Sequence, residues 1–336
     1  RQRGLESYCT IRGALRRVET SVSMNHPYRI VFMGTPDFAV PALRRLHESP
    51  NTIVAVVTNP DRPKGRGRQK VPPPVKRAAD RWGYTVFQPS SGKDPWLREK
   101  LEDLRPDLLV VIAYGQILPP SVLAIPRLGP INVHASLLPR YRGPAPIQWA
   151  IINGDRQTGV TTMWMAEGMD TGDLLLQQSV AIAPDETSGS LHRKLAETGA
   201  QLVIDTMDGL ASGQLSATPQ DESSVTYAPM LKKEDGHIDW TQSAKTLDCL
   251  IRGVNPWPGA FTFLSHKRLK IFRAEPKDVQ VQERPGIVVD GFPGDLEVAT
   301  GKGVLRLKEL QLESGKRLSV DAFVRGYPIP PGTLLS

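Results

Sequence analysis

Residues 29–58 read RIVFMGTPDFAVPALRRLHESPNTIVAVVT and carry the clearest signal of secondary structure in the chain. The apolar run 29–33 predicts a strand that stops at the turn GTPD, residues 34–37. Residues 38–47 then have helical spacing, and the run 52–58 predicts a second strand. Continuous β-branched runs of this kind are typical of strands buried on both faces of a parallel sheet. The stretch therefore predicts a β-turn-α-β unit.

The same alternation of helix and strand continues toward the middle of the chain. Helices are predicted around residues 75–82 and 96–104, and strands at 85–88 and 107–113. This order predicts an α/β fold with a Rossmann-like, doubly wound parallel sheet. No G-x-G-x-x-G motif follows the first strand, so a dinucleotide-binding dehydrogenase is disfavoured.

The ligand of such a sheet binds at the carboxyl ends of its strands. Three polar or glycine-containing segments follow predicted strands and should converge at that edge. They are Gly34, residues 114–115 and residues 132–134.

The second half of the chain changes character. Residues 188–211 predict a long helix with Ser188 as its N-cap. A polar linker follows at 213–235, and a helix is predicted at 243–253. Short β runs separated by Gly and Pro then predict a small OB-like β-barrel. These runs are residues 261–264, 269–274, 286–289, 296–300 and 304–310.

These patterns divide the chain of 336 residues into parts. We expect an α/β domain at 24–212, the linker at 213–235 and a barrel domain at 236–336. Residues 1–23 carry five arginines against two glutamates, which is +3 of the net +7, and precede Met24. We expect this extension to be a disordered or non-native leader. A transit peptide is disfavoured because the segment contains glutamates and has no clear amphipathic stripe.

Composition excludes several classes of protein. The longest apolar run, residues 108–113, is much too short to span a bilayer, so we expect a soluble, cytoplasmic protein with no membrane partner. Two cysteines, Cys9 and Cys249, fit a reducing compartment. No metal-ligand spacing of Cys or His is present, and we expect no metal.

Positive charge is concentrated in one segment. Residues 62–77 (RPKGRGRQKVPPPVKR) contain seven basic residues and no acid. Glycines and prolines predict an irregular, mobile cationic loop, which is either a solvated charge run or a site for a polyanion. A second basic cluster, residues 266–270, lies in the predicted barrel.

Candidate catalytic residues lie between positions 132 and 173. Asn132 and His134 are two apart, so on a strand they share a face, and Asp170 follows in the turn GMDTGD. An amide, an imidazole and a carboxylate can together stabilise an oxyanion and move a proton during attack on a carbonyl. Each residue alone is more often structural, and one Asp-Thr-Gly is weak evidence for an aspartic protease. The combination predicts an enzyme.

Several stretches carry a resemblance to a known family. They are VFMGTPDFAVPAL, TNPDRPKGRGR, VVIAYGQILP, INVHASLLPRYRGPAPIQWAIINGD, TGVTTMWMAEGMDTGDLL, VTYAPML and IRGVNPWPGAF. With them the chain, from about Arg29 onward, resembles the bacterial methionyl-tRNA formyltransferases among the 10-formyltetrahydrofolate-dependent enzymes. Ala135 stands where many relatives have glycine. It adds only a methyl group, so we expect activity to be retained.

The resemblance implies a reaction and roles for the three candidate residues. A formyl group would pass from 10-formyltetrahydrofolate, the co-substrate, to the α-amine of methionyl initiator tRNA for translation initiation. Asn132 and His134 would stabilise the oxyanion, and Asp170 would tune His134 and accept the released proton. We expect the enzyme to be a monomer.

The resemblance also implies binding residues. Residues 136–143 would shape the site of the folate tail or brace the cleft, and we expect bracing for most of them. The expected folate-binding residues are Val111, Ile112, Ala113, Tyr114, Gly115, Ile117, Ser136, Leu137, Leu138, Pro139 and Glu167. The expected contacts to tRNA, with the first group at the acceptor end, are Arg62, Lys64, Arg66, Arg68, Lys70, Lys267, Arg268 and Lys270.

Three alternatives remain beside this interpretation. The chain could formylate an amino sugar nucleotide, hydrolyse formyl-folate, or bind RNA without catalysis on the same fold. The basic segment 62–77 and the second domain favour tRNA over a sugar. The intact set of Asn132, His134 and Asp170 argues against a non-catalytic protein.

Overall fold

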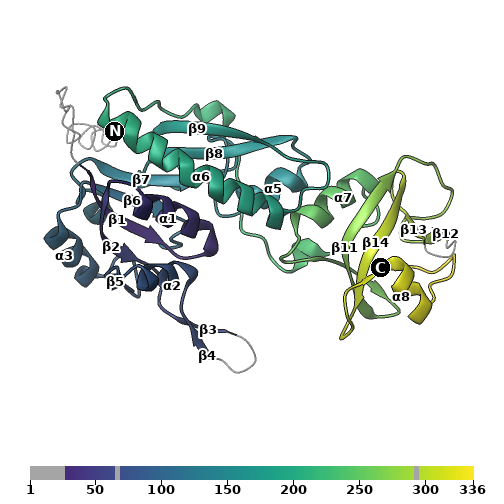
Figure 1. Ribbon diagram of the computed structural model, residues 1–336. Helices are drawn as coiled ribbons and strands as arrows, with labels where there is room; N and C mark the ends of the chain where they lie inside the picture. Colours follow the sequence, from purple (N-terminus) through teal and green to yellow (C-terminus); the bar gives the residue numbers. More distant parts are fainter. Residues whose placement is uncertain (1–26, 65–68, 291–294) are drawn as a thin grey trace, which may run out of the picture.

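The computed structural model describes residues 27–64, 69–290 and 295–336, which form two lobes joined by an extended segment (Figure 1). The N-terminal extension, Arg66 and Arg68 lie outside the described residues. The first lobe is built on a seven-stranded sheet of order β5-β2-β1-β6-β7-β8-β9.

Five strands of this sheet are parallel, as predicted. Their bounds are β1 (Arg29–Gly34), β2 (Thr52–Val57), β5 (Val86–Phe87), β6 (Leu108–Ile112) and β7 (Gly129–His134). The remaining two strands are β8 (Gln157–Trp164) and β9 (Leu174–Ala181). β8 runs antiparallel to both of its neighbours, β7 and β9, so the sheet is mixed at this edge. Residues 165–173 between β8 and β9 are too few for a crossover connection, which needs about a dozen residues.

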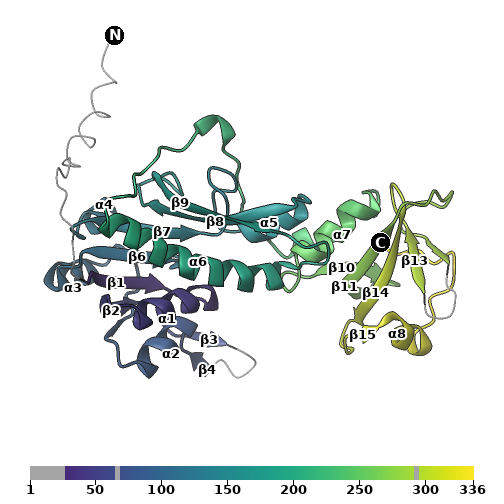
Figure 2. The same ribbon diagram turned by 45° about the horizontal axis from the view of Figure 1, so that its top comes forward.

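Helices cover both faces of the sheet (Figure 2). One face packs against α1 (Val40–Glu48), α2 (Pro74–Arg81) and α6 (Ser188–Ala211), and the other against α3 (Pro95–Leu104) and α4 (Pro120–Leu123). The N-cap of α6 is Thr187 rather than the predicted Ser188, because the Thr187 side chain accepts a hydrogen bond from the Ser190 backbone N–H at 3.2 Å.

The C-terminal lobe is a curled antiparallel sheet with a helix on each side of it in sequence, α7 (Ala244–Gly253) and α8 (Val320–Gly326). Its main path runs β10 (Ala260–Leu264), β11 (Lys267–Lys277), β14 (Val304–Leu312), β13 (Leu296–Ala299) and β12 (Val288–Asp290), and β15 (Leu318–Ser319) pairs with β14. The C-terminal tail bridges the two ends of this path, since Leu335 pairs with Leu264 and Leu334 pairs with Ile287. The predicted barrel-like fold is confirmed.

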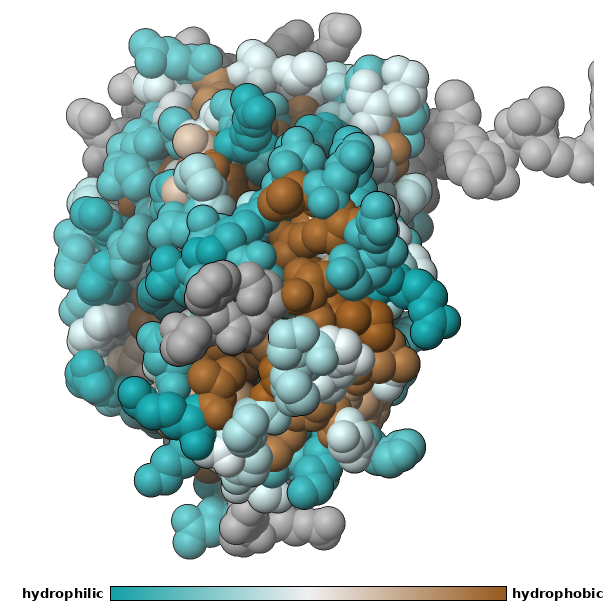
Figure 3. Space-filling view, turned by 90° about the vertical axis from the view of Figure 1, so that its right-hand side faces the viewer, coloured by the Kyte–Doolittle hydropathy of each residue, from teal (hydrophilic) through white to brown (hydrophobic). Residues whose placement is uncertain are grey.

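Figure 3 views the molecule from the side of the C-terminal lobe, where apolar side chains form a band between polar ones. Leu334, in the tail of this lobe, is 55% exposed. Within the described ranges, no helix has both the length and the apolar character needed to cross a membrane.

The basic segment is more regular than predicted. Strands β3 (Arg62–Lys64) and β4 (Gln69–Val71) pair as an antiparallel hairpin that projects from the first lobe (Figure 1). Pro63 is tolerated because a two-stranded ribbon leaves its outer edges unpaired, and proline there costs no ladder hydrogen bond.

Candidate active site

The carboxyl end of β7 presents Asn132 and His134 on one face of the sheet. Val133 between them packs on the other face, where a Cβ on Gly199 of α6 would lie 2.9 Å from its Cγ1. Asn132 pairs with Val111 of β6 and Met163 of β8. Its side chain is partly exposed and has no hydrogen-bond partner in the part of the chain that the structure describes. An amide N–H is therefore free for a substrate.

His134 is only 7% exposed and has a neighbour at each ring nitrogen. Its Nε2 lies 2.9 Å from the carbonyl oxygen of Tyr141, and its Nδ1 lies 3.6 Å from Oδ1 of Asp170. A carbonyl oxygen only accepts hydrogen bonds, so the Nε2 atom must carry a proton. In the neutral ring, Nδ1 then holds the lone pair, and a proton added there would be stabilised by the Asp170 carboxylate.

Asp170 lies in the turn between β8 and β9 and is held by the loop that follows β7. Its Oδ2 accepts a hydrogen bond of 2.8 Å from the Gly143 backbone N–H. The turn needs glycine at position 172, because a Cβ there would lie 1.7 Å from the Trp164 carbonyl oxygen. The three predicted catalytic residues are therefore brought together at one edge of the sheet.

Sequence reasoning missed two backbone groups of this site, the Tyr141 carbonyl and the Gly143 N–H. Both lie in the segment YRG, residues 141–143, but a backbone role leaves no trace in residue type. Gly143 does give a signal, since its φ of 121° is a conformation that favours glycine.

The expected folate residues of β6 and the following turn fall into two groups. Val111 and Ile112 are buried in opposite cores, so only their backbone could face a ligand. Ala113 and Gly115 are exposed and have positive φ angles of 47° and 79°. The side chain of Tyr114 is buried between them, and burial raises its pKa to about 12.

The carbonyl oxygen of Tyr114 already accepts two hydrogen bonds. The donors are Thr35 Oγ1 at 2.9 Å and Asn59 Nδ2 at 3.1 Å. The exposed backbone of Ala113 and Gly115 is thus the part of this turn left open to a ligand. Ile117 is 75% exposed, and Glu167 is exposed in the β8–β9 loop.

Residues 136–139 are held mainly by protein contacts. The Ser136 hydroxyl donates to the Arg140 carbonyl at 2.6 Å, and the Ser136 carbonyl accepts from Thr161 Oγ1 at 2.7 Å. The Leu138 N–H donates to the same Thr161 oxygen at 3.1 Å. Pro139 and Leu137 are partly exposed. These contacts agree with a bracing role for the segment.

The basic hairpin is anchored close to the same sheet edge. Arg62 and Lys70 are exposed, while the side chain of Lys64 lies outside the described residues. At the base of the hairpin, Asp61 accepts hydrogen bonds from Gln88 at 2.8 Å and from Lys76 at 3.0 Å. These two donors, Gln88 first, lower the pKa of the Asp61 carboxyl.

The second basic cluster lies on the outer face of β10 and β11. Arg268 stands opposite Phe263, and its guanidinium lies 4.5 Å from the centre of the Phe261 ring. Lys270 pairs with Phe261 on the same face, and Lys267 is exposed at the start of β11. This arrangement joins cations to aromatic rings on one surface.

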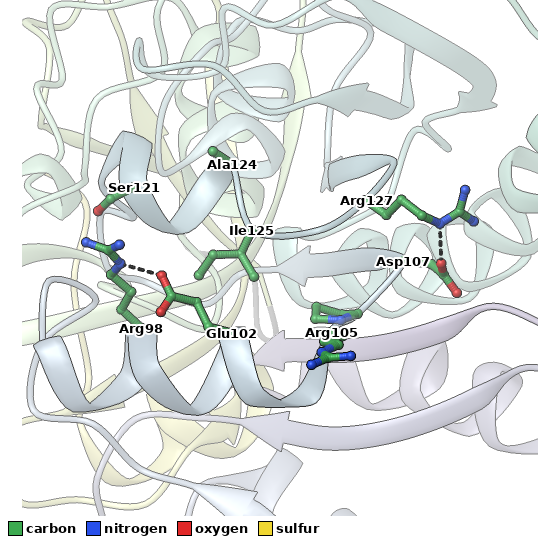
Figure 4. Close-up of a pocket in the computed structure, with 9 residues that line it drawn as sticks. Arg98, Glu102, Arg105, Asp107, Ser121, Ala124, Ile125 and Arg127 are labelled. Carbon is green, nitrogen blue, oxygen red and sulfur yellow. Dashed lines mark hydrogen bonds and ion pairs between the residues drawn. The ribbon is translucent and has the colours of Figure 1, made fainter. Parts of the chain in front are cut away.

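A hollow of about 550 Å³ lies between α3, α4 and the segments that precede β6 and β7 (Figure 4). Its lining includes Asp107, which precedes β6, so it lies at the amino ends of the strands and away from His134. Figure 4 shows two of its arginines paired, Arg98 with Glu102 and Arg127 with Asp107. Among the residues described, no three His, Cys, Asp or Glu side chains are grouped to hold a metal.

Comparison with known proteins identifies relatives along nearly the whole chain. Residues 28–207 match the family Formyl transferase, and residues 230–328 match Formyl transferase, C-terminal domain. A methionyl-tRNA formyltransferase of Citrifermentans bemidjiense is 52% identical over 307 residues, which is 91% of this chain and 96% of that protein. One of Geobacter sulfurreducens is 48% identical over 314 residues, with 91% and 96% covered.

Solved structures show the same fold at much lower identity. An N-formyltransferase of Helicobacter canadensis, in complex with folinic acid and dTDP-3-aminofucose, has a TM-score of 0.65 at 15% identity and covers 87% of this chain and all of its own. HypX of Aquifex aeolicus, in complex with tetrahydrofolic acid, has a TM-score of 0.57 at 20% identity, with 88% and 47% covered.

Proposed function

The chain belongs to the formyl transferase family, and we propose that it transfers a formyl group to the α-amine of methionyl initiator tRNA for translation initiation. The observation that carries the proposal is the contact of His134 with Asp170, beside Asn132, in a chain about half identical to methionyl-tRNA formyltransferases along 91% of its length. The formyl donor is folate-derived, and we propose 10-formyltetrahydrofolate.

The acceptor amine needs no strong base to become a nucleophile. A free α-amino group titrates near pH ~7.7–8.0, and esterification of the carboxylate lowers that value, so much of the amine is neutral at pH ~7. The barrier then lies in the oxyanion that forms on the formyl oxygen and in the proton that leaves nitrogen.

We propose that different residues of the site carry out these two tasks. The amide N–H of Asn132 is the free donor and would bind the oxyanion. The N–H of a neutral His134 is already engaged with Tyr141, which leaves the lone pair on Nδ1 to receive the proton. Asp170 would stabilise the resulting imidazolium, whose positive charge would add to the stabilisation of the oxyanion. As the bond between the formyl carbon and N10 breaks, the proton would pass to N10, so that tetrahydrofolate leaves as a neutral amine.

The folate donor would lie where β6 and β7 end. The exposed backbone at Ala113 and Gly115 would bind the edge of the flat pterin, as backbone groups often do in small-molecule sites. Asn132 is the neighbour of Val111 in the adjoining strand, so a formyl group on a pterin bound there would come within reach of its amide.

The hairpin β3–β4 would contact the acceptor end of the tRNA. Proteins read RNA best where bases are unpaired, because the A-form major groove is too narrow for side chains. An initiator tRNA with an open terminal base pair would suit the exposed Arg62 and Lys70. The outer face of β10 and β11, with Arg268 and Lys270, would hold the tRNA backbone through phosphates. We propose a cytoplasmic monomer, since translation initiation occurs in the cytoplasm.

The test is a comparison of acceptors with 10-formyltetrahydrofolate as donor. Wild type should formylate methionyl initiator tRNA in preference to elongator methionyl-tRNA and to an amino sugar nucleotide. Formylation of the sugar alone would retain the chemistry and refute the tRNA as substrate.

The same assay tests the role of the hairpin. Arg62→Ala should raise KM for initiator tRNA by an amount equivalent to about 1–3 kcal/mol and should flatten the salt dependence of KM by about one unit of slope. Arg98→Ala is the matched control, because Arg98 is an exposed arginine paired on α3 at the opposite edge of the sheet. An equal effect of both substitutions would argue against a specific role for the hairpin.

A further inference from the structure

The segment at residues 212–235 runs along the first lobe beside the Asp170 turn. Backbone hydrogen bonds tie it to that lobe, from Leu174 N–H to the Thr218 carbonyl at 2.8 Å and from Arg142 N–H to the Thr226 carbonyl at 2.9 Å. Between these two anchors lies Gln220, which is half-buried and contacts the active-site loops on two sides.

The side-chain amide of Gln220 joins groups of opposite hydrogen-bonding character. Its Nε2 donates to the carbonyl oxygens of Asp170 and Gly172, each at 2.8 Å. Its Oε1 accepts from Arg142, at 2.8 Å from Nη2 and 3.0 Å from Nε. Carbonyl oxygens only accept and a guanidinium only donates, so a primary amide in this orientation satisfies all four contacts. A carboxylate or an alkyl group would satisfy at most one side.

Arg142 occupies a central position in the loop that holds the catalytic side chains. It is 2% exposed and also pairs with Glu222 at 2.8 Å. Its chain neighbours supply the two backbone contacts described above, since Tyr141 accepts from His134 and Gly143 donates to Asp170. Gln220 therefore links this loop to the Asp170 turn through backbone carbonyl oxygens of the turn rather than through the carboxylate.

We propose that Gln220 is a positioning residue that fixes Asp170 against His134. Asp170 has a φ of 55°, a backbone conformation that is unfavourable in a non-glycine residue and persists only where its surroundings impose it. The carboxylate lies 3.6 Å from His134, beyond hydrogen-bonding distance, so its effect on the ring depends on where the turn is held. The kinetic consequence of this proposal rests on the proposed formyl transfer.

Two variants separate the contacts of Gln220. Gln220→Glu keeps an oxygen for Arg142 but replaces the N–H groups that face the two carbonyl oxygens, and Gln220→Ala removes both sides. Each should lower kcat roughly tenfold to a hundredfold, with a small change in KM, because a displacement of about 1 Å in a catalytic group has effects of this size. Gln201→Ala is the control, since this exposed glutamine on α6 donates its side-chain hydrogen bond to Asp205 and not to the active-site loops.

A double-mutant cycle tests whether Gln220 acts through Asp170. In an Asp170→Ala background, Gln220→Glu should cause little further loss of kcat, because the group that it positions is gone. Full additivity of the two losses, or unchanged kcat in both Gln220 variants, would overturn the proposal. A loss of kcat that parallels a fall in melting temperature in both backgrounds would also overturn the proposal.

Hydrogen–deuterium exchange gives a readout that does not depend on activity. The Gly143 N–H is bound to the Asp170 carboxylate, so release of the turn in Gln220→Glu should accelerate its exchange about tenfold or more while the core strands stay protected. Unchanged exchange at Gly143 would refute the positioning role. Wild type that fails to formylate methionyl tRNA would refute the proposed function, and the exchange result would still decide the role of Gln220.

Discussion

At the scale of single residues, a backbone carbonyl group sets the tautomer of the His134 ring. The Tyr141 carbonyl fixes the proton of the neutral ring on Nε2, and the Asp170 carboxylate stands near the other nitrogen. A ring held this way can gain a proton on Nδ1 without rotating. Asn132, with no side-chain partner among the described residues, remains the proposed donor for the oxyanion.

Asn132→Ala should lower kcat by on the order of 10²–10³, the usual effect of removing one oxyanion donor. The affinity for folate and the melting temperature should stay close to those of wild type, because the lost side chain makes no hydrogen bond within the described ranges. Turnover in a formyl transfer assay, with the melting temperature as control, checks this. A fall of kcat below threefold would exclude Asn132 as the main donor.

Tyr114→Phe should stabilise the protein. The Tyr114 hydroxyl is buried and has no hydrogen-bond partner among the described residues, and such a group costs about 1–3 kcal/mol. Burial raises the pKa of Tyr114 to about 12, so the hydroxyl stays protonated to a higher pH in the folded state than in the unfolded chain. The ionisation of Tyr114 therefore leaves the free energy of unfolding unchanged below pH ~10. It lowers the free energy of unfolding as the pH rises from there through the folded pKa.

Chemical denaturation of the two proteins from pH 7 to 12 measures this difference. The advantage of the Phe variant in free energy of unfolding should be present at pH 7 and should grow above pH ~10. A variant that is less stable than wild type at pH 7 would show that the hydroxyl has a partner.

At the scale of elements, the β8–β9 turn places Asp170 through tight backbone contacts. Gly172→Ala would bring a Cβ to 1.7 Å from the Trp164 carbonyl oxygen, so the turn must shift. We expect a loss of about 1–3 kcal/mol in the free energy of unfolding and a lower kcat.

Gly213→Ala is the matched control for this substitution. Gly213 has a φ of 68°, but apart from its chain neighbours no described residue has an atom within 4 Å of the position that the added methyl group would take. Only backbone strain of about 1 kcal/mol is therefore expected, with kcat unchanged. Equal effects of the two substitutions on kcat would contradict the importance of the turn.

The spacing of apolar residues along the sequence was enough to predict several elements of the first lobe. The buried run of β6, the β-turn-α-β unit around Gly34 and the shared face of Asn132 and His134 follow from periodicity alone. The reversed direction of β8 did not, because strand direction depends on connections whose ends were not assigned. The contacts of Gln220 could not be predicted either. Gln220 lies in a segment with the composition of a polar linker, and its partners Asp170 and Arg142 precede it by 50 and 78 positions in the sequence.

At the scale of the whole molecule, the two lobes are held together by more than the connecting segment. Helix α5 (Pro146–Ile152) packs on α7 so closely that a Cβ on Gly253 would lie 2.5 Å from Ile152. The Ser188 hydroxyl, at the start of α6, donates to the Asn255 carbonyl at 2.7 Å. A fixed relation between the lobes would let the hairpin β3–β4 and the outer face of β11 contact one tRNA together.

Single-turnover formyl transfer from 10-formyltetrahydrofolate to methionyl initiator tRNA, measured for wild type and for His134→Ala, tests both the proposed reaction and the role of His134. We expect transfer by wild type and a rate roughly 10²–10⁴-fold lower in the variant, the usual range for loss of a proton-transfer group. Absence of transfer by wild type, or equal rates for the two proteins, would contradict the account.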